Sequence, residues 1–404
     1  MKNWFANAKV GLFTHYTYAT YNGDVKINWG GTCKSSVDLV GADSLDQLAD
    51  GFDAKRYAAM ANAMAAQYVT FTVCHAGFNL LFPSKTMADA GCPAKASRRD
   101  LVGDLIDALS PYGIKLVLYM PPNDCHDLRD DELAILKWND DAVRMTFNSR
   151  LVHEIFERYG KYVAGYWFDQ GGPTQLVSDT IRADNPDAVI YINYGVTENE
   201  QFDAEKADLF VSEYYGQAPE GSSDSWKTHH SQISRIIGGE WWANGGKVKT
   251  TARELYRWTV RVIATEGQFN SGINWACSPY MSNEWEAGVE PLLIELGQFL
   301  RGHEGIFDTV PSNTFVTPTL SVLAKEQWGA ATESMDGKVT FLHVLNLPET
   351  NELAVDLPVC GKGKFKDAFC GTLRAGVRED GDRLIITLPD GFARDAIDTV
   401  IRLS

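Results

Sequence analysis

The chain has 404 residues, of which 45% are hydrophobic and 22% charged, and its formal net charge is −16. This length suits one large domain and a smaller one, and the composition is that of a globular protein. The acidic charge argues against nucleic acid or an anionic membrane as partner, because both require clustered Lys and Arg. No apolar run approaches the roughly 18 residues of a membrane span.

The seven cysteines are scattered and form no Cys-x-x-Cys pair, so we expect neither a disulfide framework nor a zinc site. The sequence therefore predicts no metal and no cofactor, and it leaves the oligomeric state open. The N-terminal residues lack a charged segment followed by an apolar one. No secretory signal is visible, and we expect a cytoplasmic protein unless a native signal precedes residue 1.

Short apolar segments alternate with helical segments through about residue 300. Predicted helices cover 53–67, 98–113, 142–159, 175–184, 251–266 and 290–302. Predicted strands cover 10–16, 68–73, 115–120, 162–169, 188–194, 208–215 and 269–276. Strands that alternate with helices and are apolar on both faces indicate a parallel sheet covered by helices.

Seven or eight such units predict a TIM-like (β/α) barrel. The alternative is an open doubly wound sheet, but the first strand runs into HYTYATYNG, which lacks the glycine-rich turn of nucleotide-binding folds. After Phe307 the pattern changes to short alternating strands separated by DG, GKGK and EDGD turns. We therefore expect a catalytic barrel over 1–307 and a β-sandwich domain over 308–404.

Four polar residues end otherwise apolar predicted strands: His15, His75, Asp169 and Glu213. The active site of a TIM-like barrel gathers at the C-terminal ends of its strands, so these are the candidate functional residues. His15 and His75 could donate hydrogen bonds to sugar hydroxyls. No third ligand stands at a recognisable spacing, so the two histidines do not predict a metal site.

Asp169 closes the segment YVAGYWFDQGGP, where the following glycines leave room for a ligand. Its carboxylate could attack an anomeric carbon, or it could cap the next helix. Glu213 could supply the second carboxyl group that a two-step glycosidase needs, about 5–5.5 Å from the first, or it could form a surface ion pair. Glu220 and Glu240 compete with Glu213 for this role, since they lie on loops that could fold over the site.

An ordered series of segments resembles family 29 of the glycoside hydrolases, the α-L-fucosidases, over nearly the whole chain. WFANAKVGLFTHYTY is similar to the family's opening segment, and GYWFDQ is similar to its Trp-Phe-Asp nucleophile motif. The segments ending in VCHAGFNL, KLVLYM and GHEGIFDT are similar to further family motifs in the same order. The resemblance implies a retaining exo-glycosidase that removes terminal α-L-fucose from an oligosaccharide or glycoconjugate.

The resemblance also implies roles for individual residues. Asp169 takes the place of the nucleophile, and Glu213 resembles a segment that often carries the acid/base. His15 and His75 take the places of sugar-binding histidines, and Trp29 that of a tryptophan that contacts a hydroxyl. The resemblance also implies an apolar pocket for the fucose methyl group, formed by Phe13, Tyr119 and Trp167.

Three positions depart from the family pattern. Cys74 stands where the first histidine of a His-His pair is expected, Ala76 replaces an acidic residue, and Met120 replaces a tyrosine. A thiol in place of a hydrogen-bonding histidine would change the contacts to sugar hydroxyls, so we count Cys74 among the substrate-binding candidates. This substitution leaves open a related sugar such as α-galactose, and a non-catalytic carbohydrate-binding protein remains the alternative function.

Overall fold

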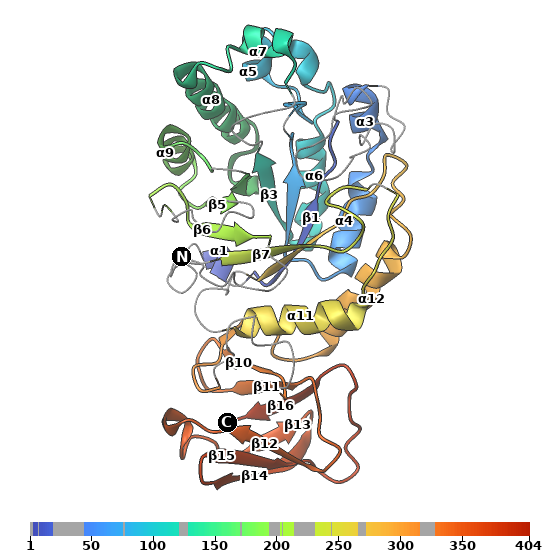
Figure 1. The fold of residues 1–404 in the computed structure, drawn as a ribbon, viewed down its shortest axis with the longest axis vertical. Helices are drawn as coiled ribbons and strands as arrows, with labels where there is room; N and C mark the ends of the chain where they lie inside the picture. Colours follow the sequence, from blue (N-terminus) through green and yellow to red (C-terminus); the bar gives the residue numbers. More distant parts are fainter. Residues whose placement is uncertain are drawn as a thin grey trace.

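Eight parallel strands close into a barrel in the computed structural model (Figure 1). They follow one another in the order β1 to β8, and β8 pairs back with β1. This closure confirms the predicted TIM-like barrel and excludes the open doubly wound sheet. The structure describes residues 3–6, 8–18, 44–75, 77–120, 128–169, 172–193, 203, 205–213, 231–243, 245–265, 272–315 and 328–404.

Seven of the barrel strands match strands predicted from the sequence, and one was missed. The missed strand is β7, whose sequence SQISRI is too polar to be recognised as an apolar run. The bounds are β1 Val10–Thr14, β2 Tyr68–Thr72, β3 Lys115–Met120, β4 Val163–Phe168, β5 Val189–Asn193, β6 Leu209–Ser212, β7 Ser231–Ile236 and β8 Ile273–Ala276.

Helices cover the outside of the barrel, and several begin at a side chain that caps the first turn. Thr251 caps α11 by accepting from the backbone of Glu254, whose carboxylate accepts from Thr251 in return. The bounds are α1 Asn3–Ala6, α3 Leu45–Gly51, α4 Ala54–Ala63, α5 Lys85–Asp89, α6 Leu101–Leu109, α7 Asp130–Leu136, α8 Asp141–Tyr159, α9 Gln175–Asp184, α11 Ala252–Ala264 and α12 Val289–Gly302.

Strand residues alternate between the barrel interior and the layer beneath the helices. The interior cluster contains Phe13, Tyr68 and Trp167, whereas Leu12 and Phe71 belong to the cluster under the helices. The Tyr68 ring lies over Gly11 of the neighbouring strand β1, where an added Cβ would come within 2.3 Å of it. Large aromatic side chains therefore fill the barrel, which is a packed core with polar residues at its C-terminal rim.

The C-terminal strands form an antiparallel sheet in the order β12-β15-β14-β13-β16-β11-β10-β9. The first half of β14 pairs with β13 and its second half with β15, so the sheet folds over its own core as the predicted sandwich requires. The domain boundary at residues 307 and 308 stays a prediction. The bounds are β9 Thr309–Pro311, β10 Ala330–Ser334, β11 Thr340–Val344, β12 Glu352–Asp356, β13 Ala368–Cys370, β14 Leu373–Asp380, β15 Arg383–Thr387 and β16 Thr399–Leu403.

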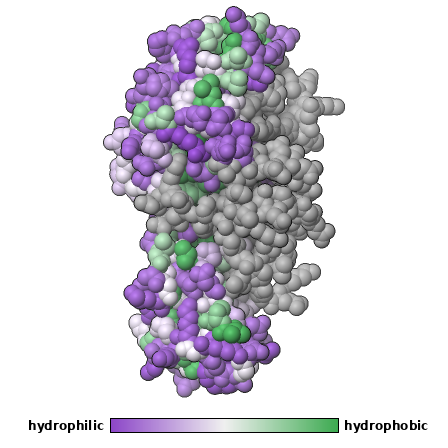
Figure 2. All heavy atoms as spheres, turned by 90° about the vertical axis from the view of Figure 1, so that its left-hand side faces the viewer, coloured by the Kyte–Doolittle hydropathy of each residue, from purple (hydrophilic) through white to green (hydrophobic). Residues whose placement is uncertain are grey.

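The described surface in Figure 2 is mostly hydrophilic, and its hydrophobic residues stand in small separate spots. Large exposed hydrophobic side chains are accordingly spread over different elements, as with Ile135 on α7, Leu176 on α9 and Met335 after β10. Single exposed residues of this kind are normal on a globular surface. No helix in the described ranges is long and apolar enough to cross a membrane.

Candidate active site

Three neighbouring strands each end in a polar side chain that points to the barrel interior. Along β5, the interior positions are Val189, Tyr191 and then Asn193. Asp169 follows β4 at the position two residues after Trp167, and Glu213 follows β6 two residues after Val211. Since β4, β5 and β6 are adjacent and in parallel register, the period of two brings all three polar groups to one point of the rim.

The Asn193 amide connects the two carboxyl groups. Its Nδ2 donates to Asp169 Oδ1 at 2.7 Å and to Glu213 Oε1 at 2.5 Å. The Tyr119 hydroxyl, from the end of β3, donates to the other oxygen of Asp169 at 2.8 Å. Both carboxyl groups therefore lie within 2.7 Å of one nitrogen, which is compatible with the separation of about 5–5.5 Å in retaining glycosidases.

The two carboxyl groups differ in their surroundings. Burial and the neighbouring charge of Asp169 raise the pKa of Glu213 to about 8, against the opposing effect of the Asn193 hydrogen bond. Burial, and then the charge and hydrogen bond of Asp169, raise the pKa of Tyr119 well above its usual value. At neutral pH Glu213 is therefore protonated, and Tyr119 remains a hydrogen-bond donor to Asp169.

Aromatic side chains cluster around Tyr119, which bonds to Asp169, and we call this cluster of rings the aromatic pocket. His75 stacks on Tyr119 with 5.4 Å between ring centroids, and Tyr119 stacks on Trp167 at 5.1 Å. His15 lies 5.8 Å from His75 and 5.2 Å from Tyr119. The structure thus brings together five of the predicted site residues: Phe13, His15, His75, Tyr119 and Trp167.

Two buried nitrogens of the aromatic pocket have no hydrogen-bond partner in the described part of the chain. They are Nδ1 of His15 and Nε1 of Trp167. Burial, and after it the neighbouring His75, lower the pKa of His15 well below its usual value, so the imidazole is neutral. A buried unpaired polar atom costs about 1–3 kcal/mol, and a ligand hydroxyl that bonds to it would recover this cost.

Two of the three departures from the family pattern lie away from the aromatic pocket. Cys74 is only 1% exposed and belongs, with Met120, to the apolar cluster between the barrel and its helices. Burial raises the pKa of its thiol, so it is a neutral core residue. This placement does not support Cys74 as a sugar contact, because the chain bends after Thr72 and turns both Val73 and Cys74 to the outer cluster.

The remaining predicted positions either lie outside the described residues or lack a contact with the two carboxyl groups. Trp29, Ala76 and Glu220 lie outside the described residues. Glu240 is exposed and has Glu286 and Lys249 as its charged neighbours. Among the glutamates that the structure describes, Glu213 is therefore the one in direct reach of the Asn193 amide that also binds Asp169.

Three site residues were missed by the sequence reasoning. Asn193 is the amide between the carboxyl groups, and Trp241 and Trp242 close the aromatic pocket beside His15, at 5.7 and 6.3 Å between ring centroids. The two tryptophans follow β7, so recognising that strand would have placed them at the rim. In the described ranges, no group of three or more His, Cys, Asp or Glu side chains is placed to hold a metal ion.

Comparison with known proteins places the chain among relatives of similar fold. A Caenorhabditis elegans relative named "Putative alpha-L-fucosidase" is 21% identical over 356 aligned residues, which cover 77% of this chain and 67% of the relative. The solved GH29 α-L-fucosidase from Bacteroides thetaiotaomicron has a TM-score of 0.72 at 18% identity and covers 100% of this chain and 94% of its own. Thermotoga maritima α-fucosidase in complex with fucose has a TM-score of 0.69 at 17% identity, covering 100% and 97%.

At such identities the solved structures establish the shared two-domain fold. The family is established by the α-L-fucosidase family model, which matches residues 42–302. This range includes β2 to β8 and the whole Asp169–Asn193–Glu213 group. The chain therefore belongs to the α-L-fucosidase family, family 29 of the glycoside hydrolases.

Proposed function

We propose that this chain is a retaining exo-glycosidase that removes terminal α-L-fucose, or a close relative of it, from glycans by double displacement. Asp169 attacks the anomeric carbon, and Glu213 protonates the leaving oxygen. Glu213 then takes a proton from water as the water hydrolyses the glycosyl-enzyme ester. The observation that carries the proposal is the shared Asn193 amide, which binds both carboxyl groups at once.

The protonation states support this division of roles. A nucleophile must be ionised, and the two hydrogen bonds that Asp169 accepts from Tyr119 and Asn193 favour the anion. A general acid must carry its proton at the working pH, which the raised pKa of Glu213 provides. A general acid and a nucleophile need different pKa values, and two carboxyl groups in different environments provide them.

The aromatic pocket supports a sugar with one apolar face. Phe13 lies 5.0 Å from Trp167 and 6.1 Å from Tyr119 between ring centroids, so three rings form a wall that suits the methyl group of fucose. Trp167 Nε1 can donate to a sugar hydroxyl and His15 Nδ1 can donate or accept, and neither has a partner in the described part of the chain. An apolar pocket discriminates weakly against an added hydroxyl, so α-L-galactosides, which carry a hydroxyl on the carbon that is the methyl group of fucose, deserve the same assay.

Replacement of Asp169 tests the proposal. Asp169→Asn should lower turnover of an aryl α-L-fucoside by at least about a thousandfold, because the amide is not a nucleophile. The wild type should gain the mass of one sugar after reaction with a 2-fluoro-fucosyl fluoride, and Asp169→Asn should not. Asp187→Asn is the matched control, since Asp187 forms an exposed ion pair with Lys161 before β5.

The alternative is a carbohydrate-binding protein without catalysis on the same fold. It predicts affinity for fucose without product and without a covalent adduct in the wild type. Full turnover in Asp169→Asn would instead reject Asp169 as the nucleophile. The three outcomes separate an enzyme with this nucleophile, an enzyme with another one, and a binder.

A further inference from the structure

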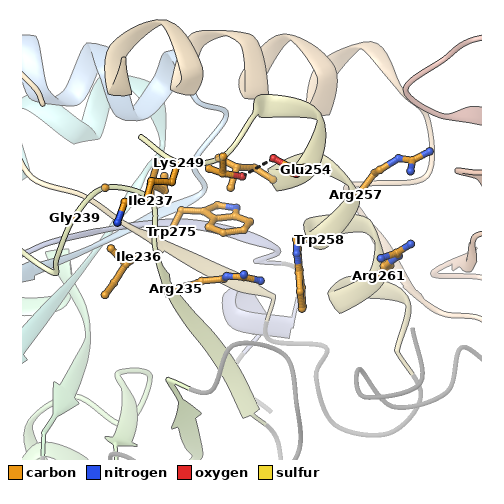
Figure 3. A pocket seen from close by; sticks show the side chains of 13 residues that line it. Arg235, Ile236, Ile237, Gly239, Lys249, Glu254, Arg257, Trp258, Arg261 and Trp275 are labelled. Atoms are coloured by element: carbon orange, nitrogen blue, oxygen red, sulfur yellow. Dashed lines mark hydrogen bonds between the residues drawn. The ribbon is translucent and has the colours of Figure 1, made fainter. Parts of the chain in front are cut away.

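A second cleft lies outside the barrel wall, between β7, β8 and helix α11 (Figure 3). Its volume is about 580 Å³. Gln232 and Ser234 of β7 are buried, and Gln232 bonds to Tyr68 inside the barrel, so the alternating residue Arg235 points outward. Trp275 of β8 belongs to the outer cluster and closes the back of the cleft. The aromatic pocket is thus on the other side of the strands.

Positive charge dominates the lining of this cleft. Four basic side chains line it, and Glu254 is the one acidic residue among the lining residues; the basic residues are Arg235, Lys249, Arg257 and Arg261. This is a local reversal of sign in a chain of net charge −16. Oxygen Oε2 of Glu254 accepts from Thr250 Oγ1, Thr251 N and Thr251 Oγ1 at 2.8–3.0 Å, so this carboxylate serves the helix cap.

Two arginines on successive turns of α11 form no ion pair with a described acidic side chain, although the charge of Asp398 acts on Arg257. Arg257 donates from Nη1 to Asn346 at 3.3 Å, and its buried Nε has no partner in the described part of the chain. The Arg261 side chain makes no hydrogen bond or ion pair with a described residue. Like charges at this spacing repel by a few tenths of a kcal/mol, and an anion bound between them would remove the repulsion. Burial and neighbouring arginines lower the pKa of Arg257, and burial lowers that of Arg261.

The cations lie on both sides of one indole ring. The Arg235 guanidinium is 4.2 Å from the centre of the Trp258 ring, a cation–π contact that holds it in place. In Figure 3, Trp258 stands between Arg235 on one side and Arg257 and Arg261 on the other. A single small ion cannot contact all of these groups across the ring. A ligand with charged groups at more than one point fits the arrangement better.

We propose that this cleft binds a ligand that carries oxyanion groups, such as phosphate or sulfate esters, at more than one position. Arginine suits this chemistry because its planar guanidinium forms paired hydrogen bonds to two oxygens of one group. The cleft is separate from the aromatic pocket, so binding there requires no hydrolysis. Gly238 and Gly239 line the cleft, and Trp241 of the aromatic pocket follows them within three residues of the chain.

Calorimetric titration of the full chain with two probes tests the proposal. Dextran sulfate carries many sulfate esters, whereas inorganic phosphate is a single oxyanion; neutral dextran is the blank. Dextran sulfate should bind saturably and more tightly than phosphate. Arg261→Gln should weaken this binding by about tenfold or more, because it removes one charge-assisted contact. The control is Arg383→Gln, a solvent-exposed residue of β15 outside the lining, which should change affinity less than about threefold.

Each outcome decides a separate point. Saturable binding of dextran sulfate that only Arg261→Gln weakens supports the proposal. Binding of phosphate alone would overturn the requirement for several oxyanion groups and leave a small-ion site. Absence of binding by both probes, or equal losses in Arg383→Gln and Arg261→Gln, would overturn the site. Since binding is measured without substrate, the result is independent of whether Asp169 is a nucleophile.

Discussion

The amide of Asn193 donates hydrogen bonds to both neighbouring carboxyl groups and so reduces the repulsion between them. An amide nitrogen carries two hydrogens, and here one goes to Asp169 and one to Glu213. Two carboxylates this close repel each other when both are ionised, so the pair retains one proton. Burial and the charge of Asp169 raise the pKa of Glu213 to about 8, and the proton therefore stays on Glu213 at pH 7.

The shifted pKa predicts a pH dependence of catalysis. Glu213 is protonated below about pH 8, so kcat/KM for a natural fucoside should fall as the pH rises through about 8. Glu213→Gln should remove this alkaline limb and lower activity by about 10²- to 10⁴-fold. Aryl fucosides with good leaving groups need less protonation and should lose less. Added azide should restore part of the second step, because it attacks the intermediate without base catalysis.

Glu240→Gln is the control for this prediction, because Glu240 is exposed and lies beside Glu286 and Lys249. It should keep both the rate and the alkaline limb. If Glu240→Gln loses the limb and Glu213→Gln keeps it, the acid/base assignment moves to Glu240. That result would leave Asp169 untouched, since the two tests use different variants.

At the scale of elements, the strands that are apolar on both faces could be predicted from the sequence, whereas the strand with one polar face, β7, was missed. In β7 the interior positions are Gln232 and Ser234, and Gln232 donates to the Tyr68 hydroxyl at 2.6 Å across the barrel. This pairing depends on a strand 164 residues away, so local periodicity cannot show it. Because β7 was not predicted, Trp241 and Trp242, which follow it, were not recognised as site residues. Asp169 was found because its strand is apolar up to the last residue.

Asn193 was missed for a related reason. An amide at a strand end has no distinctive pattern, and its role depends on β4 and β6 lying on either side of β5. The order of strands in a closed barrel supplies that information. Candidate residues could therefore be named from the sequence, whereas the contacts between them are known only from the structure of the closed barrel.

Glu154 on α8 anchors the start of α5. Its carboxylate accepts from Ser84 Oγ at 2.9 Å and from the backbone nitrogens of Lys85 and Thr86 at 2.6 and 2.9 Å. Burial tends to raise its pKa, but the hydrogen bonds from Thr86, Lys85 and Ser84 outweigh burial and lower it. The two backbone groups belong to the first turn of α5, which has no other partner for them within the helix.

Glu154→Gln should destabilise the fold by about 1–3 kcal/mol at pH 7, because the amide offers one accepting oxygen in place of two. A lowered folded pKa means that the carboxylate contributes stability above the unfolded value near 4.5, and that this contribution is lost as the pH falls through the folded pKa. The difference in urea midpoint between wild type and variant should therefore shrink in acid. Glu157→Gln, exposed on the same helix, should match the wild type throughout, and an equal loss there would contradict the anchor.

At the scale of the molecule, α11 lies between the barrel and the C-terminal sheet (Figure 1). A buried network crosses this contact. The Tyr256 hydroxyl of α11 donates to Asp398 Oδ2 at 2.7 Å, and His343 Nδ1 of β11 lies 2.7 Å from the same oxygen. His343 Nε2 in turn lies 3.2 Å from Thr332 Oγ1, whose hydroxyl donates to the Gly305 carbonyl at 2.8 Å. The side chains of His343 and Asp398 are fully buried.

This network connects the barrel to the sheet through directional contacts. The sheet lies beside α11, which also forms one wall of the basic cleft. A buried hydrogen-bond network fixes one arrangement of its parts, because any other leaves polar groups without partners. The sheet therefore holds α11 in one position against the barrel.

Tyr256→Phe removes one donor from the network without changing the packing of the ring. It leaves the buried Asp398 oxygen with His343 alone, so we expect a loss of about 1–3 kcal/mol in unfolding free energy and a lower urea midpoint. Hydrolysis below the unfolding transition should stay at the wild-type rate, since Tyr256 lies outside the aromatic pocket. Tyr166→Phe is the matched control, because the Tyr166 ring is also buried but its hydroxyl bonds to no described residue. Equal midpoints for the two variants would show that the Tyr256 hydroxyl adds nothing to the contact between barrel and sheet. A midpoint lowered only in Tyr256→Phe would show that this contact stabilises the whole chain.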